Sequence, residues 1–148
     1  MQNFQFFNPV RIHFGADSHA NLANEIPASA RVLILYGGGS VLKNGTLADV
    51  KAALGERTCF EFGGIEPNPR YETLLKAVAL ARQERVDFLL AVGGGSVIDG
   101  TKFVAAAIRY EGDSADLLAS RGKVIKQVVP FGVVLTPPGS SIPKASYV

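Results

Sequence analysis

The pentapeptide Gly-Gly-Gly-Ser-Val occurs twice in this chain, at Gly37–Val41 and again at Gly93–Val97. Each copy follows an apolar run, RVLILY before the first and DFLLAV before the second. Apolar runs without polar alternation are typical of strands covered on both faces, as in a parallel sheet. Each repeat is therefore expected to be a turn at the end of a buried strand and not a flexible linker.

Helical patterns alternate with the strand patterns along the chain. Strands are expected over 31–36, 57–62, 87–92 and 128–137, and helices over 17–25, 47–54, 68–86 and 96–110. In the third helix Asn68 is a good N-cap and Pro69 suits the first turn. This alternation predicts an α/β fold, a Rossmann-like, doubly wound parallel sheet with helices on both faces.

The chain of 148 residues has the size of one ordinary domain. We expect a domain over 1–136 that begins with an N-terminal β-hairpin at 4–14, whose turn is at Asn8-Pro9. Residues 137–148 are expected to be an atypical C-terminal tail.

Composition excludes several classes of function. The net charge of +2, without any block of like charge, argues against a nucleic-acid partner. The single cysteine, Cys59, excludes an internal disulfide and suits a reducing compartment. The N-terminal residues do not have the pattern of a signal peptide, and no apolar run could span a membrane. A cytoplasmic protein is expected.

The second repeat has the features of a phosphate-binding turn. Glycine lets a ligand approach the backbone, and the helix that follows offers unpaired N–H groups to an anion. Ser96 is expected to be its N-cap, with Asp99 completing a capping box. The Gly-x-Gly-x-x-Gly spacing fails at Ile98, and no Gly-Lys-Ser/Thr ends the run. A nucleotide site is favoured on spacing alone, and a structural turn without a ligand is the alternative.

Two longer segments of the sequence indicate a particular family of nucleotide-binding proteins. FGGIEPNP at Phe62–Pro69, together with AVGGGSVIDGTKFVAAA at Ala91–Ala107, resembles the amino-terminal domain of the iron-containing (group III) alcohol dehydrogenases. The similarity is greatest to the branch of NADPH-dependent aldehyde reductases and butanol dehydrogenases. NPVRIHFG and RVLILYGGGSVLKNG resemble that branch as well.

The resemblance implies an NADP-binding domain that serves hydride transfer between NADP(H) and a short-chain alcohol or aldehyde. It implies that the second repeat binds the pyrophosphate and adjoining ribose, that Asn68 lines the cofactor cleft, and that Thr136 lies on its nicotinamide or adenine side. The candidate residues of the second repeat are Gly94, Gly95, Ser96, Val97 and Asp99.

The first repeat would then distinguish NADP from NAD. Members of the family that prefer NAD resemble other dinucleotide domains in placing an acidic residue at this strand end, where it holds the ribose hydroxyls. Tyr36–Leu42 contains no Asp or Glu. Gly37, Gly38, Gly39 and Ser40 are therefore expected to hold the 2′-phosphate, with Lys43 near them, and NADP is favoured over NAD.

The metal of the family has no predicted site here. Relatives bind iron or zinc through an Asp and three His of a second, helical domain, which this chain is expected to lack. His13 and His19 are the only histidines, and their spacing is no metal signature. No catalytic residue is assigned, and the chain alone is expected to be inactive.

The sequence is compatible with two other functions. One is a nucleotide-binding or oligomerisation module without catalysis, in which the N-terminal hairpin pairs with a partner strand and builds a homo-oligomer. The other is an enzyme of the glycerol or dehydroquinate type that shares this fold. The Phe62–Pro69 pattern argues against it, because that pattern favours the alcohol dehydrogenase branch.

Overall fold

The computed structural model describes residues 10–15, 17–120, 123, 127–136 and 145–147, the last three by their backbone alone. The turn at Asn8-Pro9 and the first half of the expected hairpin lie outside these residues, as does most of the expected C-terminal tail. No helix in the described ranges is both long enough and apolar enough to cross a membrane.

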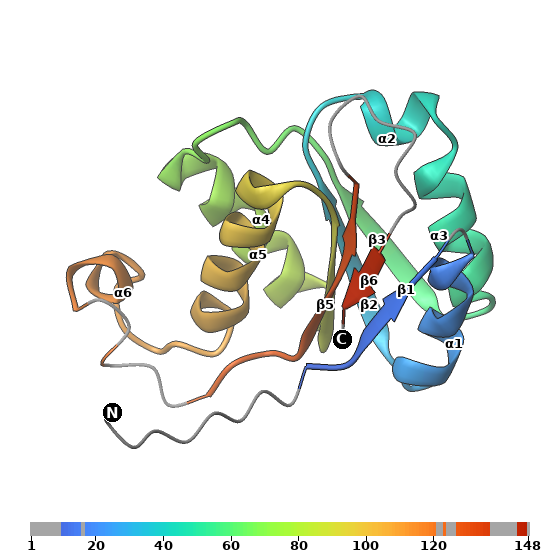
Figure 1. The fold of residues 1–148 in the computed structure, drawn as a ribbon. Coiled ribbons are helices and arrows are strands. Elements are labelled where there is room, and N and C mark those ends of the chain that lie inside the picture. Colours follow the sequence, from blue (N-terminus) through green and yellow to red (C-terminus); the bar gives the residue numbers. More distant parts are fainter. Residues whose placement is uncertain (1–9, 16, 121–122, 124–126, 137–144, 148) are drawn as a thin grey trace, which may run out of the picture.

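A twisted sheet forms the centre of the molecule (Figure 1). Its parallel part contains β2 (Arg31–Tyr36), β3 (Thr58–Phe62), β4 (Phe88–Gly93) and β5 (Phe131–Leu135). They lie in the order β3-β2-β4-β5. Every residue of β4 is buried, and so are the four central residues of β2, because helices cover both faces of the sheet.

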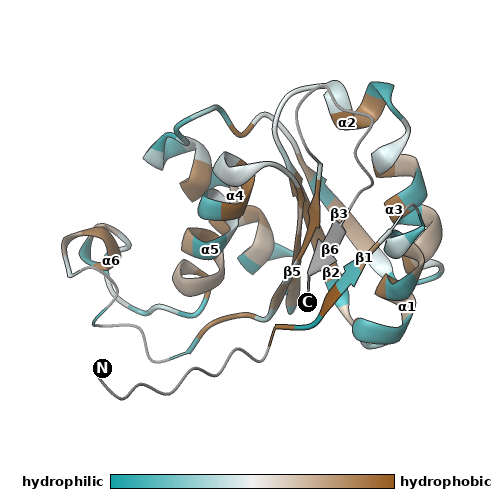
Figure 2. Cartoon of the chain, in the orientation of Figure 1, coloured by the Kyte–Doolittle hydropathy of each residue, from teal (hydrophilic) through white to brown (hydrophobic). Residues whose placement is uncertain are grey.

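The helices divide between the two faces, as Figure 1 shows. α4 (Tyr71–Gln83) and α5 (Gly95–Ala107) pack on one face, where Leu33 and Leu35 of β2 join their apolar cluster. α1 (Leu22–Glu25), α2 (Ser40–Lys43) and α3 (Thr46–Leu54) lie on the other, over Val32 and Ile34. The apolar colouring is concentrated on the sheet and on the inner sides of the helices (Figure 2). The doubly wound α/β prediction is confirmed.

Two short antiparallel strands extend the sheet beyond β5. β6 (Ala145–Tyr147) pairs with β5, and β1 (Ile12–Phe14) pairs with β6. Residues from the expected hairpin and from the expected tail thus lie next to each other in one sheet. The remaining elements are the 3₁₀ turn η1 (Ser18–Asn21) and α6 (Ala115–Ala119).

Two expected helix starts are wrong. α4 begins at Tyr71 with Arg70 as its N-cap, whereas Asn68 has a left-handed φ of 57°. Asparagine tolerates that conformation, and the residue before a proline is disfavoured in a right-handed helix. The carboxylate of Glu66 acts at this helix start instead, since it accepts hydrogen bonds from the Arg70 N–H at 3.4 Å and the Thr73 hydroxyl at 2.7 Å.

α5 also departs from the expected capping box. The helix begins at Gly95, its N-cap is Gly94, and no side chain makes a capping hydrogen bond. Ser96 therefore lies inside the first turn. The apolar face of α5 was predicted correctly in its main part, since Val97, Thr101, Val104 and Ala105 are all buried.

Candidate functional site: a cleft at the ends of β2 and β4

The two Gly-Gly-Gly-Ser-Val repeats meet at the point where the strand order reverses. The chain moves from β2 outward to β3 and then returns past β2 to β4. Because right-handed crossovers in opposite directions place their helices on opposite faces, the segments that follow β2 and β4 diverge. This divergence opens a crevice beyond the carboxyl ends of the strands, the usual place for a ligand in such sheets.

Backbone hydrogen bonds tie the loops around the crevice together. The N–H of Gly64 donates to the carbonyl of Gly37 at 2.9 Å, and the N–H of Ile65 donates to Tyr36 at 3.2 Å. On the other side, the N–H of Thr136 donates to Gly93 at 3.0 Å. The loops after β2 and β3 are thus joined on one side of the rim, and those after β4 and β5 on the other.

A cavity of about 460 Å³ lies inside this rim. Its wall contains segments of both repeats, the loop after β3 and the end of β5. The lining residues are Gly37, Gly38, Ser40, Val41, Asn44, Ile65, Pro67, Val92, Gly93, Gly94, Gly95, Ser96, Val97 and Thr136. None of them carries a charged side chain.

Five glycines line the cavity, and they fall into two groups. An added Cβ at Gly37 would lie 3.1 Å from the carbonyl oxygen of Ile65, and Gly93 has a φ of +153°. These two are needed for the fold itself. A Cβ at Gly38, Gly94 or Gly95 would meet no protein atom within 4 Å. Packing within the described chain therefore does not require glycine at these three positions.

The wall formed by α5 offers backbone donors. The first hydrogen bond of the helix runs from the Ile98 N–H to the Gly94 carbonyl at 3.1 Å. The N–H groups of Gly95, Ser96 and Val97 precede it and lie beside the cavity, at the positive end of the helix dipole. Such an arrangement favours an anionic group of a ligand.

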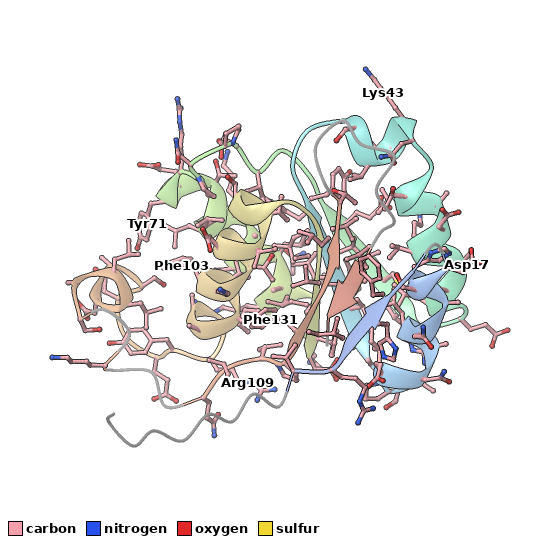
Figure 3. All side chains as sticks on the ribbon, in the orientation of Figure 1. Asp17, Lys43, Tyr71, Phe103, Arg109 and Phe131 are labelled. Carbon is pink, nitrogen blue, oxygen red and sulfur yellow. The ribbon has the colours of Figure 1, made fainter. Side chains whose placement is uncertain are left out.

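The opposite wall comes from α2 and the residue after it. Ser40, Val41 and Asn44 lie on the cavity side, as their spacing of one and four residues on a helix predicts. Lys43 is exposed and points away from the sheet, beyond α2 (Figure 3). The cation that the sequence suggested near the first repeat is therefore not part of the wall.

Three of the candidate residues do not line this cavity. Gly39 is the N-cap of α2, and Asn68 lies in the loop that leads to α4. Asp99 is exposed and borders a second, smaller cavity of about 210 Å³ between α4, α5 and α6. The rings of Tyr71 and Phe103, labelled in Figure 3, meet edge to face there at 5.8 Å.

Sequence reasoning missed six of the lining residues, namely Val41, Asn44, Ile65, Pro67, Val92 and Gly93. Ile65 and Pro67 belong to the FGGIEPNP segment, so their place in that motif was an available signal. Asn44 follows Ser40 by four residues, and the helical spacing could have indicated that the two share one side of α2.

The described lining residues carry no charged side chain, and the carboxylate of Glu66, in the same loop as Ile65 and Pro67, is engaged in hydrogen bonds. The hydrogen bond from the Thr73 hydroxyl to Glu66 is the main reason why the pKa of that carboxyl lies below its usual value. Among the described residues there is no group of three or more His, Cys, Asp or Glu side chains that could hold a metal ion. His13 contacts Glu25 at 3.0 Å, far along the chain from both repeats.

Comparisons with known proteins identify the family. The model of the iron-containing alcohol dehydrogenase family matches residues 9–147. The NADPH-dependent aldehyde reductase YqhD of Escherichia coli is 55% identical over 142 residues, which are 95% of this chain and 37% of that protein. A probable NADH-dependent butanol dehydrogenase of Bacillus subtilis is 44% identical over 139 residues, 92% of this chain and 36% of that protein.

A solved structure gives the same result for the fold. The NADH-dependent butanol dehydrogenase A of Thermotoga maritima superimposes with a TM-score of 0.84 at 40% identity, over 92% of this chain and 35% of that one. The chain thus spans a little over a third of the length of these relatives. The match over most of its residues confirms the resemblance seen in the two long segments, and the chain belongs to the iron-containing alcohol dehydrogenase family.

Proposed function

We propose that this chain is the NADP-binding part of an alcohol dehydrogenase or aldehyde reductase. The nicotinamide of the bound cofactor would exchange a hydride with a short-chain alcohol or aldehyde. The residues of this chain would bind the cofactor and orient it, and none of them is assigned a chemical step. The proposal concerns the cleft between the two repeats.

The open space at Gly38, Gly94 and Gly95 carries this proposal. Packing within the described chain does not require glycine at these positions, because a Cβ would meet no protein atom within 4 Å. A ligand whose phosphates approach the backbone closely does require it. The donors at the start of α5 would hold the pyrophosphate, and Gly38 and Ser40 would lie against the adenosine end.

The choice of NADP over NAD rests on the chemistry of the wall. A carboxylate at the end of the first dinucleotide strand holds ribose hydroxyls and repels a 2′-phosphate. The residues that line this cleft include neither Asp nor Glu. The relatives named above differ in this respect, one being described as NADPH-dependent and two as NADH-dependent, so the preference has to be decided by the residues of each chain.

The substitution Gly38→Asp tests both the site and the preference. The added side chain has room, and its carboxylate would enter the cleft beside the proposed 2′-phosphate. Losing one charge-assisted contact costs about 1.5–3 kcal/mol, and each 1.4 kcal/mol is a tenfold change in affinity. We expect NADPH to bind about ten- to a hundredfold more weakly, with NADH unchanged or tighter.

Calorimetric titration of both cofactors into the two proteins measures this difference. Gly39→Asp is made in parallel, because Gly39 is adjacent in sequence but does not line the cavity. If NADPH does not bind the unchanged protein, the proposed function is wrong. If Gly38→Asp weakens the binding of both cofactors equally, the first repeat does not distinguish NADPH from NADH by the 2′-phosphate.

We also propose that the chain forms a homo-oligomer through its N-terminal hairpin. On β1, Ile12 is 57% exposed and Phe14 is 71% exposed, an unusual position for apolar side chains on a short outer strand. Light scattering of the Phe14→Glu variant and of the unchanged protein tests this proposal, and an unchanged molecular mass would contradict it.

We propose a cytoplasmic location because the single cysteine, Cys59, is free. Cell fractionation checks this proposal.

A further inference from the structure

Asn44 has a side chain whose orientation is fixed by a second hydrogen bond. The N–H of Thr46 donates to the Oδ1 atom of Asn44 at 3.0 Å. A backbone N–H can only donate, so the amide oxygen must face Thr46. The amide nitrogen then occupies the opposite side of the planar group, and Asn44 lines the cavity whereas Thr46 does not.

The amide nitrogen thus offers N–H donors to the cleft. No hydrogen-bond acceptor for it is found within the described ranges of the chain. Ser40 lies one helical turn earlier on the same side, and the Asn44 N–H donates to its carbonyl at 3.0 Å. Ser40 and Asn44 therefore form one polar strip on the wall made by the first repeat.

This strip differs from the rest of α2. Leu42 and Lys43 are exposed and do not line the cavity, so the only cation of the helix does not face the cleft. Among the residues that the structure describes on this side of the cleft, the donors for an anionic ligand are neutral, namely the serine hydroxyl, the asparagine amide and backbone N–H groups. A phosphate monoester has only acceptor oxygens when it is fully ionised, which suits such donors.

We propose that the Asn44 amide determines cofactor specificity by donating to the 2′-phosphate of NADP. This inference rests on the proposed function, because it assumes that the adenosine end of the cofactor lies against α2. In this proposal Asn44 acts only in recognition of the cofactor, and no step of the hydride transfer is assigned to it. The bond from Thr46 holds the amide in one orientation, so that its donors are directed before the ligand arrives.

The substitution Asn44→Asp distinguishes a role of Asn44 in binding the ligand from a role in the structure of the turn. The new carboxylate keeps an oxygen for the Thr46 N–H, and an acidic group near the start of α3 is favourable to that helix. The fold is therefore expected to persist. The donors toward the cleft are replaced by a charged acceptor, which repels a phosphate.

The test measures the binding of 2′,5′-ADP and 5′-AMP by calorimetry, since these two probes differ in the 2′-phosphate and lack the nicotinamide. We expect Asn44→Asp to weaken 2′,5′-ADP at least tenfold and 5′-AMP less than twofold. Asn24→Asp is the matched control, since Asn24 is exposed on α1 and its charge change lies outside the cleft. It should alter neither affinity.

Several outcomes would overturn the inference. An equal loss of both probes would make Asn44 a structural residue of the turn, as would unchanged binding of both in a variant that melts like the unchanged protein. If those results occur while NADPH binds and Gly38→Asp weakens it selectively, only the role of Asn44 fails. If the unchanged protein binds neither NADPH nor 2′,5′-ADP, the proposed function fails together with it.

Discussion

At the scale of single residues, the glycines of the two repeats serve different purposes. Gly37 and Gly93 are required by the backbone, one through the close approach of Ile65 and the other through its positive φ. Gly38, Gly94 and Gly95 have open space in place of a side chain. The same residue type therefore supports the turn at some positions and leaves room for a ligand at others.

Gly95→Ala distinguishes these two purposes. Alanine has a higher helix propensity than glycine, and its Cβ would meet no protein atom at this position. We expect an unchanged or slightly higher melting temperature. We also expect NADPH to bind at least tenfold more weakly, which is about 1.4 kcal/mol, because the methyl group would occupy the path of the phosphate.

Thermal melting and calorimetric titration of the same sample check this expectation. A variant that melts normally and binds NADPH as tightly as the unchanged protein would assign Gly95 to the turn alone. A variant with a much lower melting temperature would show that the first turn of α5 does not tolerate a Cβ.

At the scale of elements, Arg57 joins the ends of two helices just before β3. Its guanidinium donates to the carbonyls of Ala23 and Ile26 near the end of α1, and to Leu54 at the end of α3. These carbonyls have no further partner within their own helices. The planar group, with its five donors, reaches both helix ends at once.

Arg57→Lys should therefore destabilise the fold although it keeps the charge. A single ammonium cannot span both helix ends. We expect a loss of about 1–3 kcal/mol in the free energy of unfolding, the cost of leaving such acceptors unsatisfied. Urea unfolding followed by circular dichroism measures it. Arg85→Lys at an exposed position is the control, and an equal effect of the two changes would refute the role.

A second contact between elements depends on pH. Glu25 of α1 accepts hydrogen bonds from Arg11 at 2.9 Å and contacts His13 of β1 at 3.0 Å. The Arg11 hydrogen bond, followed by that of His13, holds the pKa of this carboxyl below its usual 4.5. A lowered pKa in the folded state stabilises the protein at higher pH, and this stabilisation is lost as the pH falls through the folded-state pKa.

We accordingly expect Glu25→Gln to be less stable than the unchanged protein at pH 7, with a difference that shrinks as the pH falls below 4.5. Urea midpoints at pH 7, 5.5 and 3.5 test this. Glu56→Gln, at an exposed position, is the matched control. A difference that is the same at every pH would mean that the charge of Glu25 does not matter.

At the scale of the whole molecule, the reversal of the strand order brings the two repeats together. They are far apart in the sequence but follow neighbouring strands, β2 and β4. Each face of the sheet has its own apolar cluster, and the cleft lies where the segments leading to the two faces separate. A ligand in the cleft would contact elements from both layers.

Binding there should consequently stabilise the whole fold. A ligand that binds only the folded state adds about 2.7 kcal/mol at a concentration of 100 times its dissociation constant. We expect saturating NADPH to raise the melting temperature of the unchanged protein. The rise should be much smaller for Gly95→Ala at the same concentration, and equal shifts for the two proteins would argue that NADPH binds elsewhere.

The sequence by itself determined the parallel strands, the main helices and the covering of both faces of the sheet, but not the short elements α2, α6 and β6. The apolar runs that became β2 and β4 have no polar alternation, and a strand with that composition is stable only when both of its faces are covered. The buried side of α5 follows from the spacing of Val97, Thr101 and Val104 in the same way. These properties are local, since they depend on residues close together in the chain.

The tertiary structure decided which residues share the cleft. Asn68 and Asp99 belong to the motifs of the family resemblance, but the loop before α4 and the turn of α5 place them away from the cavity. Asn44 entered the wall because α2 turns one side toward the end of β4. α4 begins at Tyr71 because Asn68 has a left-handed φ, and the carboxylate of Glu66 accepts a hydrogen bond from the N–H of Arg70 just before the helix. Such outcomes depend on contacts between distant segments, and only the packed chain fixes those contacts.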